Sequence, residues 1–188
     1  MHTIPINTEE NSLEILGGKG RSLARMTRSG FRVPDGFIVT ADAYRDFVNE
    51  CGIQEKIIEL AKPDLKNGYP NFEECSKKIQ LIIESNQTPD STRNKIIEAY
   101  EGLSGKDLRM AVRSSANAED LPELSFAGQQ ETFLNISTSA AIIESVHKCW
   151  ASLWTPQAIS YRHQNGIDQS SVAMAVVVQK MIPSEVSG

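Results

Sequence analysis

A glycine-rich segment that contains one lysine is the first candidate for chemistry in this chain. It reads Gly17-Gly-Lys-Gly20. Glycines let several backbone N–H groups approach an anion closely, and a lysine ammonium is a point charge suited to phosphate. We expect a glycine turn that leads into a helix over 22–29, whose N-terminus adds partial positive charge. The spacing is not that of a Walker A motif, and a flexible turn with an exposed lysine is the alternative.

The residues after this segment are strongly basic. Five basic residues and no acidic ones lie from Lys19 to Arg32. Arg21, Arg25 and Arg28 are spaced so that they share one face of a helix. Because such a face is commonly a solvated one, we favour that interpretation for the three arginines. Lys19, at the turn itself, is the better candidate for binding an anion.

Arg113 is the second candidate, at the end of a segment in which apolar and polar residues alternate. This alternation predicts a strand over 108–113. Strand ends in α/β proteins often lie at a ligand crevice, where a guanidinium can hold phosphate oxygens in a fork. The two serines that follow add hydroxyl and amide donors. A structural ion pair with Glu119, Asp120 or Glu123 is the alternative.

A polar loop over 114–129 follows this strand and contains Ser125, Phe126 and Gly128. Ser125, Gly128 and the backbone around them could fold over a phosphate chain. A surface loop packed by its own leucine and phenylalanine is the alternative. The acidic residues of the loop are irregularly spaced, which favours a solvated segment over a metal site.

The histidines and cysteines form no motif typical of a metal site or a nucleophile. The histidines are therefore interpreted as structural or solvent-facing, and the cysteines as reduced, buried thiols. Two tryptophans four residues apart are assigned to the core. The residues concerned are His2, His147, His163, Cys51, Cys75, Cys149, Trp150 and Trp154.

The elements that must position these residues follow from periodicity and capping signals. Nearly every residue of 172–181 is apolar, as expected for a strand that is covered on both faces. A mixture of strands and helices in a chain of this length indicates an α+β or mixed α/β fold. The other expected elements are strands at 36–40 and 131–135, a helix capped by Thr40 that closes at Gly52, helices that begin at Asn71, at Thr88-Pro89 and at Thr155-Pro156, and a helix through Ile142 and Leu153.

Composition excludes several classes of protein. The chain has 188 residues and a net charge of −5, which argues against a general binder of nucleic acid or of anionic membranes. The start has no apolar signal-peptide core, and the odd number of cysteines without a C-x-x-C pair indicates a cytoplasmic protein. A complete (β/α)₈ barrel needs at least about 200 residues and is excluded.

Several segments together, in order along the chain, resemble one family. They are Gly17–Gly20, Val33–Thr40, Ala111–Ser115, Ala118–Asp120, Ser125–Gln129, Thr132–Asn135, Trp150–Trp154 and Ala158–Arg162. The chain resembles the N-terminal nucleotide-binding domain of the phosphoenolpyruvate-utilising dikinases. That family includes phosphoenolpyruvate synthase (pyruvate, water dikinase), pyruvate phosphate dikinase and rifampicin phosphotransferase.

The resemblance implies an ATP-grasp type of fold, which clamps ATP between two α+β subdomains. We expect residues 1–188 to form most of its first lobe, with a glycine-turn and mainly helical part over 1–105 and a strand and helix part over 106–188. We expect the domain to be incomplete after Gly188, where the fold of the family continues into another strand.

The resemblance also implies the site residues. Lys19 and Arg113 would contact the ATP phosphates. Gly128 and Thr132 would lie along the loop and strand that cover the nucleotide, and Gln179 would lie near the adenine. The resemblance places the Mg²⁺ ligands beyond this chain, so no metal ligand and no catalytic residue is assigned within it.

The chemistry implied by the resemblance moves phosphate from ATP to a carrier histidine on another domain, and then to an acceptor. None of the three histidines here lies in a motif like that of the carrier, so this chain alone is expected to have no turnover. Its expected partners are ATP and the phosphohistidine and acceptor-binding domains, without nucleic acid or membrane. The alternatives are the ATP-binding part of a rifampicin phosphotransferase and a stand-alone, non-catalytic nucleotide-binding module.

Overall fold

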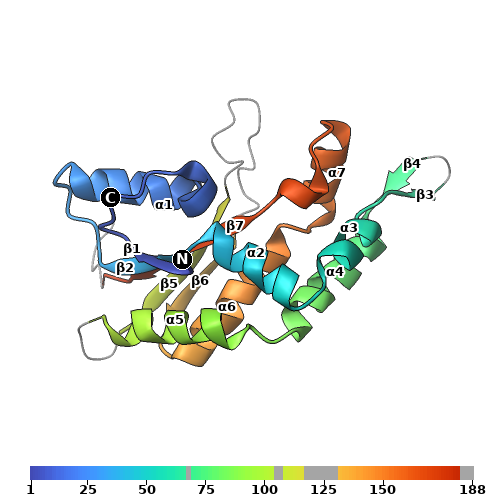
Figure 1. Ribbon diagram of the computed structural model, residues 1–188. Coiled ribbons are helices and arrows are strands. Elements are labelled where there is room, and N and C mark those ends of the chain that lie inside the picture. Colours follow the sequence, from blue (N-terminus) through green and yellow to red (C-terminus); the bar gives the residue numbers. More distant parts are fainter. Residues whose placement is uncertain (67–68, 104–107, 117–130, 183–188) are drawn as a thin grey trace.

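One antiparallel sheet organises this protein in the computed structural model, which describes residues 1–66, 69–103, 108–116 and 131–182. Its five strands lie in the order β1-β2-β7-β5-β6, and a separate two-stranded sheet pairs β3 with β4 (Figure 1). The strands are β1 (Thr3–Pro5), β2 (Gly36–Val39), β3 (Asp64–Lys66), β4 (Tyr69–Asn71), β5 (Met110–Ala116), β6 (Thr132–Ile136) and β7 (Met174–Lys180).

Helices cover both faces of the five-stranded sheet. Helix α1 lies on one face, whereas α5 and α6 lie on the other, as Figure 1 shows. The helices are α1 (Leu13–Arg28), α2 (Ala41–Glu50), α3 (Gln54–Leu60), α4 (Glu73–Ser85), α5 (Asp90–Glu101), α6 (Ser139–Ser152) and α7 (Pro156–Gln164), followed by a 3₁₀ turn (Gln169–Ser171). This arrangement confirms the α+β prediction.

Alternation along the strands divides the core into two apolar clusters. Val176 and Val178 pack into the larger cluster with α2, α4 and α6. Ala175 and Val177, on the opposite face of the same strand, pack against α1 in the smaller cluster. The central strand β7 is therefore buried on both faces, as its apolar sequence predicts. Both tryptophans, at positions 150 and 154, lie in the larger cluster, which confirms that assignment.

Two of the predicted helix caps are confirmed. The Thr40 hydroxyl accepts a hydrogen bond from the Ala43 N–H (3.4 Å), and the Thr155 hydroxyl accepts one from the Ala158 N–H (3.3 Å). Each bond reaches an N–H group of the first turn, which has no carbonyl four residues earlier in the helix to donate to.

The other two predicted caps need correction. Helix α4 begins one residue later than an Asn71 cap requires, although the Asn71 side chain still accepts a hydrogen bond from the Glu73 N–H (3.1 Å). Thr88 is not a cap, because α5 begins at Asp90 without a side-chain cap. The Thr88 hydroxyl instead lies 2.7 Å from the Nε2 atom of His147, a tertiary partner that local sequence does not reveal.

Several elements were not predicted from the sequence: β1, β3, β4, α3, the 3₁₀ turn and the part of α1 over 13–21. Strand β1 pairs with β2 over only three residues, too few for alternation to be recognised. The strand prediction for 131–135 is correct within one residue, since β6 spans Thr132–Ile136.

Buried His147 leads to a prediction about pH. Burial lowers the pKa of its imidazole, against a smaller raising effect of a hydrogen bond involving the backbone at Glu84. The unfolded chain therefore binds a proton more readily than the folded one. The stabilisation is complete above the unfolded pKa of about 6.5 and is lost as the pH falls toward the lower folded value.

We expect the free energy of unfolding to decrease on acidification with a slope of up to about 1.4 kcal/mol per pH unit from this group. Urea unfolding at several pH values measures that slope, which His147→Gln should flatten. His163→Gln, at an exposed position, is the control. An unchanged slope in His147→Gln would contradict the assignment.

Candidate functional site

The glycine segment lies inside a helix and is not the turn that the sequence predicts. Helix α1 already begins at Leu13 and continues through the segment. It is interrupted at Gly17, whose φ of 65° and ψ of 175° are not helical. Because glycine has no Cβ, it adopts this positive φ without the cost that other residues meet. Lys19 therefore lies in the first turn of the helical part that follows the interruption.

This interruption brings α1 into direct contact with β5. A Cβ atom at Gly17 would lie 1.9 Å from the carbonyl oxygen of Ser115, so another residue fits there only if α1 or β5 shifts. The Ser115 hydroxyl accepts a hydrogen bond from the Gly20 N–H (3.0 Å) and donates one to the Leu16 carbonyl (2.9 Å). These contacts fix α1 against β5, although the two elements are far apart in the sequence.

The same contact brings Lys19 to the strand that carries Arg113. The Lys19 ammonium donates a hydrogen bond to the carbonyl oxygen of Ser114, at 2.6 Å. Ser114 lies beyond the last paired residues of β5 and β6, which are Arg113 and Thr132. The Lys19 ammonium therefore contacts the backbone of the residue that follows Arg113, although 94 residues separate Lys19 from Arg113 in the sequence.

Arg113 lies on the face of the sheet that α1 covers. Its partner in β7 is Val177, which packs against α1, whereas its neighbour Val112 packs into the larger cluster. The Arg113 side chain is half-buried and forms no hydrogen bond or ion pair with the described residues. The acidic loop residues that could pair with it lie outside the described residues, so that alternative stays open.

The remaining predicted site residues fall in different settings. Thr132 is exposed and lies opposite Arg113 in the ladder of β5 and β6. Gly128 lies outside the described residues. Gln179 is buried on β7, and its side-chain amide donates a hydrogen bond to the Pro34 carbonyl (3.1 Å). Its role near an adenine stays a prediction.

A buried thiol lies within the electrostatic reach of Lys19. Burial raises the pKa of Cys149, the charge of Glu131 raises it further, and the charge of Lys19 lowers it. Because burial dominates, the thiol stays protonated and is a poor nucleophile. This supports the interpretation of Cys149 as a buried apolar residue.

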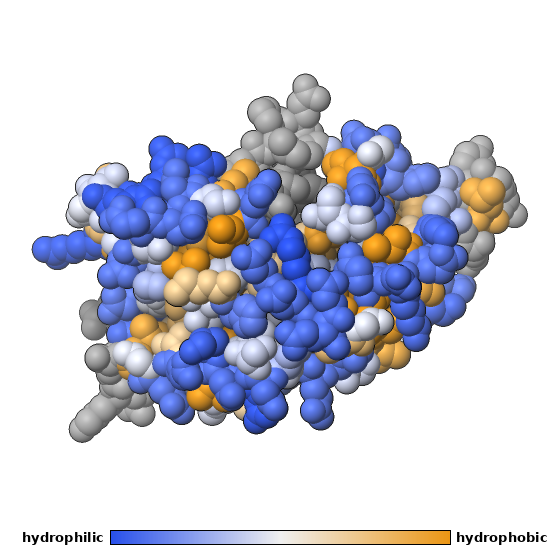
Figure 2. All heavy atoms as spheres, in the orientation of Figure 1, coloured by the Kyte–Doolittle hydropathy of each residue, from blue (hydrophilic) through white to orange (hydrophobic). Residues whose placement is uncertain are grey.

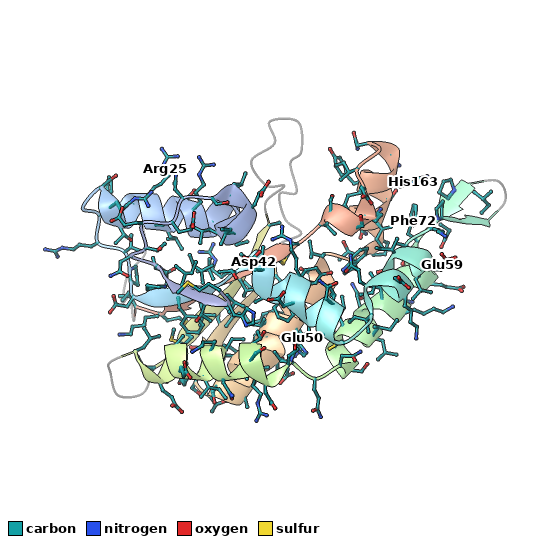
Figure 3. The ribbon with its side chains drawn as sticks, in the orientation of Figure 1. Arg25, Asp42, Glu50, Glu59, Phe72 and His163 are labelled. Carbon is teal, nitrogen blue, oxygen red and sulfur yellow. The ribbon has the colours of Figure 1, made fainter. Side chains whose placement is uncertain are left out.

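The three arginines of α1 show mainly surface interactions. Arg25 extends away from the sheet in Figure 3, and the outer face of α1 is largely hydrophilic in Figure 2. Arg28 donates hydrogen bonds to the carbonyls of Thr8 (3.1 Å) and Glu10 (3.2 Å). These two arginines match the predicted solvated face. Arg21 differs, because its Nε is buried without a hydrogen-bond partner among the described residues.

The roles of Ser114 and Ser115 differ from those predicted. Both were expected to offer donors to a ligand, but both are buried in β5. Ser114 supplies a carbonyl to Lys19, and Ser115 supplies its hydroxyl to α1. No local signal could reveal this, because the partners lie 95 and 99 residues away along the chain.

A hollow of about 330 Å³ between α3 and α7 is a second location to consider. Arg162 contributes to its wall, but this guanidinium donates to the Gln169 side chain (2.6 Å) and the Leu153 carbonyl (2.8 Å). It also lies over the Trp154 ring at 5.1 Å. Burial lowers the pKa of Arg162 to about 10. These contacts indicate a structural role at the junction of α6 and α7.

The aromatic packing beside this hollow is also structural. Phe72, just before α4, and His163, on α7, approach each other in Figure 3, with ring centroids 5.7 Å apart. In the part of the chain that the structure describes, no three or more His, Cys, Asp and Glu side chains are grouped to hold a metal ion. None of the helices in the described ranges is long and apolar enough to cross a bilayer.

Comparisons with known proteins show the family of this chain. Residues 13–188 match the family described as pyruvate phosphate dikinase, AMP/ATP-binding domain. A probable phosphoenolpyruvate synthase of Methanocaldococcus jannaschii is 48% identical over 180 residues, which cover 94% of this chain and 15% of that protein. One from Archaeoglobus fulgidus is 45% identical over 185 residues, covering 97% of this chain and 25% of the relative.

A rifampicin phosphotransferase of Streptomyces sviceus is similar to a comparable extent. It is 43% identical over 185 residues, which cover 96% of this chain and 21% of that protein. The chain thus spans between 15% and 25% of the length of these three relatives. The family match covers α1 with Lys19, β5 with Arg113 and β7 with Gln179. This chain therefore belongs to the pyruvate phosphate dikinase AMP/ATP-binding domain family.

Proposed function

We propose that this chain binds ATP, with Lys19 and Arg113 as the residues that contact its phosphates. The observation that carries the proposal is the hydrogen bond between the Lys19 ammonium and the carbonyl of Ser114, the residue after Arg113. It brings two cationic residues to adjoining positions at the end of the β5–β6 ladder. Membership in an AMP/ATP-binding domain family supports a nucleotide as the anion.

The proposed chemistry is charge neutralisation with little covalent work by the protein. Lys19 supplies a point charge, and the guanidinium of Arg113 can hold two phosphate oxygens in a fork. The part of α1 that continues after Gly17 adds the partial positive charge of a helix N-terminus. We also propose that Thr132 and Gln179 line the nucleotide, at the phosphate and adenine ends respectively, within an ATP-grasp type of fold.

We propose that this chain is part of a longer dikinase similar to phosphoenolpyruvate synthase. This chain would hold ATP while a carrier histidine on another domain accepts the phosphate and passes it to pyruvate. Magnesium, when bound, would neutralise phosphate charge, and we place its ligands outside this chain. No turnover is expected from the 188 residues alone.

The test of ATP binding uses an extended chain, in which these residues are followed by the further domains that the proposal implies, titrated calorimetrically with ATP and Mg²⁺. We expect Arg113→Ala to lower the affinity by about 10- to 100-fold, because a hydrogen bond to a charged group contributes about 1.5–3 kcal/mol. Arg93→Ala is the matched control, since Arg93 is an exposed arginine of α5 that pairs with Asp90 at 3.8 Å. Equal affinities of Arg113→Ala and wild type would argue against the proposal.

A rifampicin phosphotransferase is the second candidate, favoured by the relative from Streptomyces sviceus. Incubating the extended protein with ATP and either pyruvate or rifampicin separates the two activities. Phosphoenolpyruvate as the product supports the first candidate, and phosphorylated rifampicin supports the second. Tight ATP binding by the 188-residue chain, without transfer by the extended protein, would instead indicate a non-catalytic nucleotide-binding module.

A further inference from the structure

The hydroxyl of Ser115 occupies the position of a missing helical hydrogen bond. In a regular α-helix, the Gly20 N–H would donate to the carbonyl of Leu16, four residues earlier. Here the Ser115 hydroxyl accepts from that N–H (3.0 Å) and donates to that carbonyl (2.9 Å). A side chain inserted between the two groups of a helical bond is a recognised cause of helix kinks. The kink at Gly17 therefore has an identifiable partner in β5.

Both members of this contact are constrained. Ser115 has no exposed surface, so the hydroxyl is the internal partner of two polar groups that water does not reach. Gly17 passes so close to the Ser115 carbonyl that a Cβ atom would overlap it. The strand and the kinked helix therefore hold one relative position.

The relative position of α1 and β5 determines which atoms the Lys19 side chain can contact. Lys19 lies between Gly17, where the helix is interrupted, and Gly20, whose N–H is held by Ser115. From there its ammonium reaches the carbonyl of Ser114, the residue next to Ser115. Adjacent residues of β5 thus bind the helix backbone at Leu16 and Gly20 and the charged end of Lys19.

We propose that Ser115 is a positioning residue for ATP binding. Its hydroxyl bridges the interrupted turn of α1 and thereby holds the Lys19 ammonium beside Arg113. Ser115 contacts no nucleotide itself and acts through Lys19. This inference rests on the proposed function, because it assigns Lys19 to the phosphates.

The hydrogen-bonding role is distinguishable from simple packing. Ser115→Ala leaves the Gly20 N–H and the Leu16 carbonyl without their partner. Ser115→Cys keeps a side chain of similar shape but offers only a weak donor and acceptor. We expect both variants to lower the ATP affinity of the extended chain by about tenfold, as the loss of one net hydrogen bond predicts.

The decisive experiment is a double-mutant cycle between Ser115→Ala and Lys19→Ala, with ATP affinity measured calorimetrically and stability measured by urea unfolding. If Ser115 acts through Lys19, Ser115→Ala has an effect of less than about twofold in the Lys19→Ala background. Ser76→Ala is the matched control, since the buried Ser76 hydroxyl donates to the distant Trp154 carbonyl (2.6 Å). It should lower stability and leave ATP affinity unchanged.

The outcomes separate the two proposals. The positioning role is overturned if the effects of the two substitutions on ATP affinity are fully additive, or if Ser115→Ala keeps wild-type affinity. In either case, a loss of affinity in Lys19→Ala still supports ATP binding. Wild-type affinity in Ser115→Cys shows that packing suffices and also overturns that role. If Ser115→Ala does not fold, the same cycle is measured with Ser115→Cys. Wild-type affinity in Lys19→Ala overturns the phosphate-binding assignment, and the positioning role with it.

Discussion

Lys19→Ala is expected to lower the ATP affinity of the extended chain by about 10- to 100-fold, measured by calorimetric titration. The substitution removes a charge-assisted hydrogen bond to phosphate, and the charge is already held at the site by the Ser114 carbonyl (2.6 Å). A positioned charge binds more strongly than a freely rotating one, because less side-chain entropy is lost on binding. The loss should be smaller at high ionic strength, where part of the attraction is screened.

Lys95→Ala provides the control for this prediction. Lys95 is an exposed lysine of α5 that pairs with Glu98 at 2.8 Å, and α5 lies on the opposite side of the sheet from α1 (Figure 1). Its removal changes the net charge equally but leaves the glycine segment intact. If both variants lost the same affinity, net charge would explain the result and Lys19 would have no special role.

Gly17→Ala is expected to have the largest effect on stability. Its φ of 65° and ψ of 175° lie in a region that is essentially restricted to glycine and that costs other residues about 1–3 kcal/mol. The new atom would also lie 1.9 Å from the Ser115 carbonyl oxygen, and relieving such overpacking costs about 1–3 kcal/mol more. We therefore expect the free energy of unfolding to fall by about 2–6 kcal/mol. Nucleotide affinity should fall as well, because α1 must move away from β5 to make room.

Gly30→Ala is the control that separates the conformational cost of a positive φ from the cost of overpacking. Gly30 also has a positive φ, of 82°, but a Cβ atom there would meet nothing within 4 Å. Only the conformational cost of about 1–2 kcal/mol should appear in its urea unfolding curve. Similar losses of stability in the two variants would show that the close approach of Gly17 to β5 is unimportant.

The sequence predicted correctly those helices and strands that depend on interactions between neighbouring residues. The apolar run that became β7 and the threonine caps of α2 and α7 depend on residues that are neighbours in the chain, so periodicity and cap chemistry identify them. The prediction failed at Thr88, whose hydroxyl bonds to His147 on a distant helix. It also failed over residues 13–21 of α1, since a segment with three glycines favours a turn unless tertiary contacts hold it in a helix.

The candidate site was predicted in part. Glycine, lysine and arginine were recognised by residue type as suited to phosphate, and the resemblance to the dikinases joined Lys19 with Arg113. The sequence could not show that Ser115 bridges α1, because Leu16 and Gly20 lie nearly a hundred residues before it. Nor could it show that Gln179 is buried with its amide on the Pro34 carbonyl.

For this protein, the sequence alone determined the α+β class, the main helices and strands and the residue types suited to binding phosphate. Short-range periodicity, backbone preference and charge depend only on residues that are neighbours in the chain, so the sequence alone reveals them. Only the tertiary structure decided that α1 is kinked at Gly17, and that the Lys19 ammonium bonds to the strand of Arg113. Those facts depend on hydrogen bonds and a close backbone approach between distant segments, and such contacts exist only once the chain has folded.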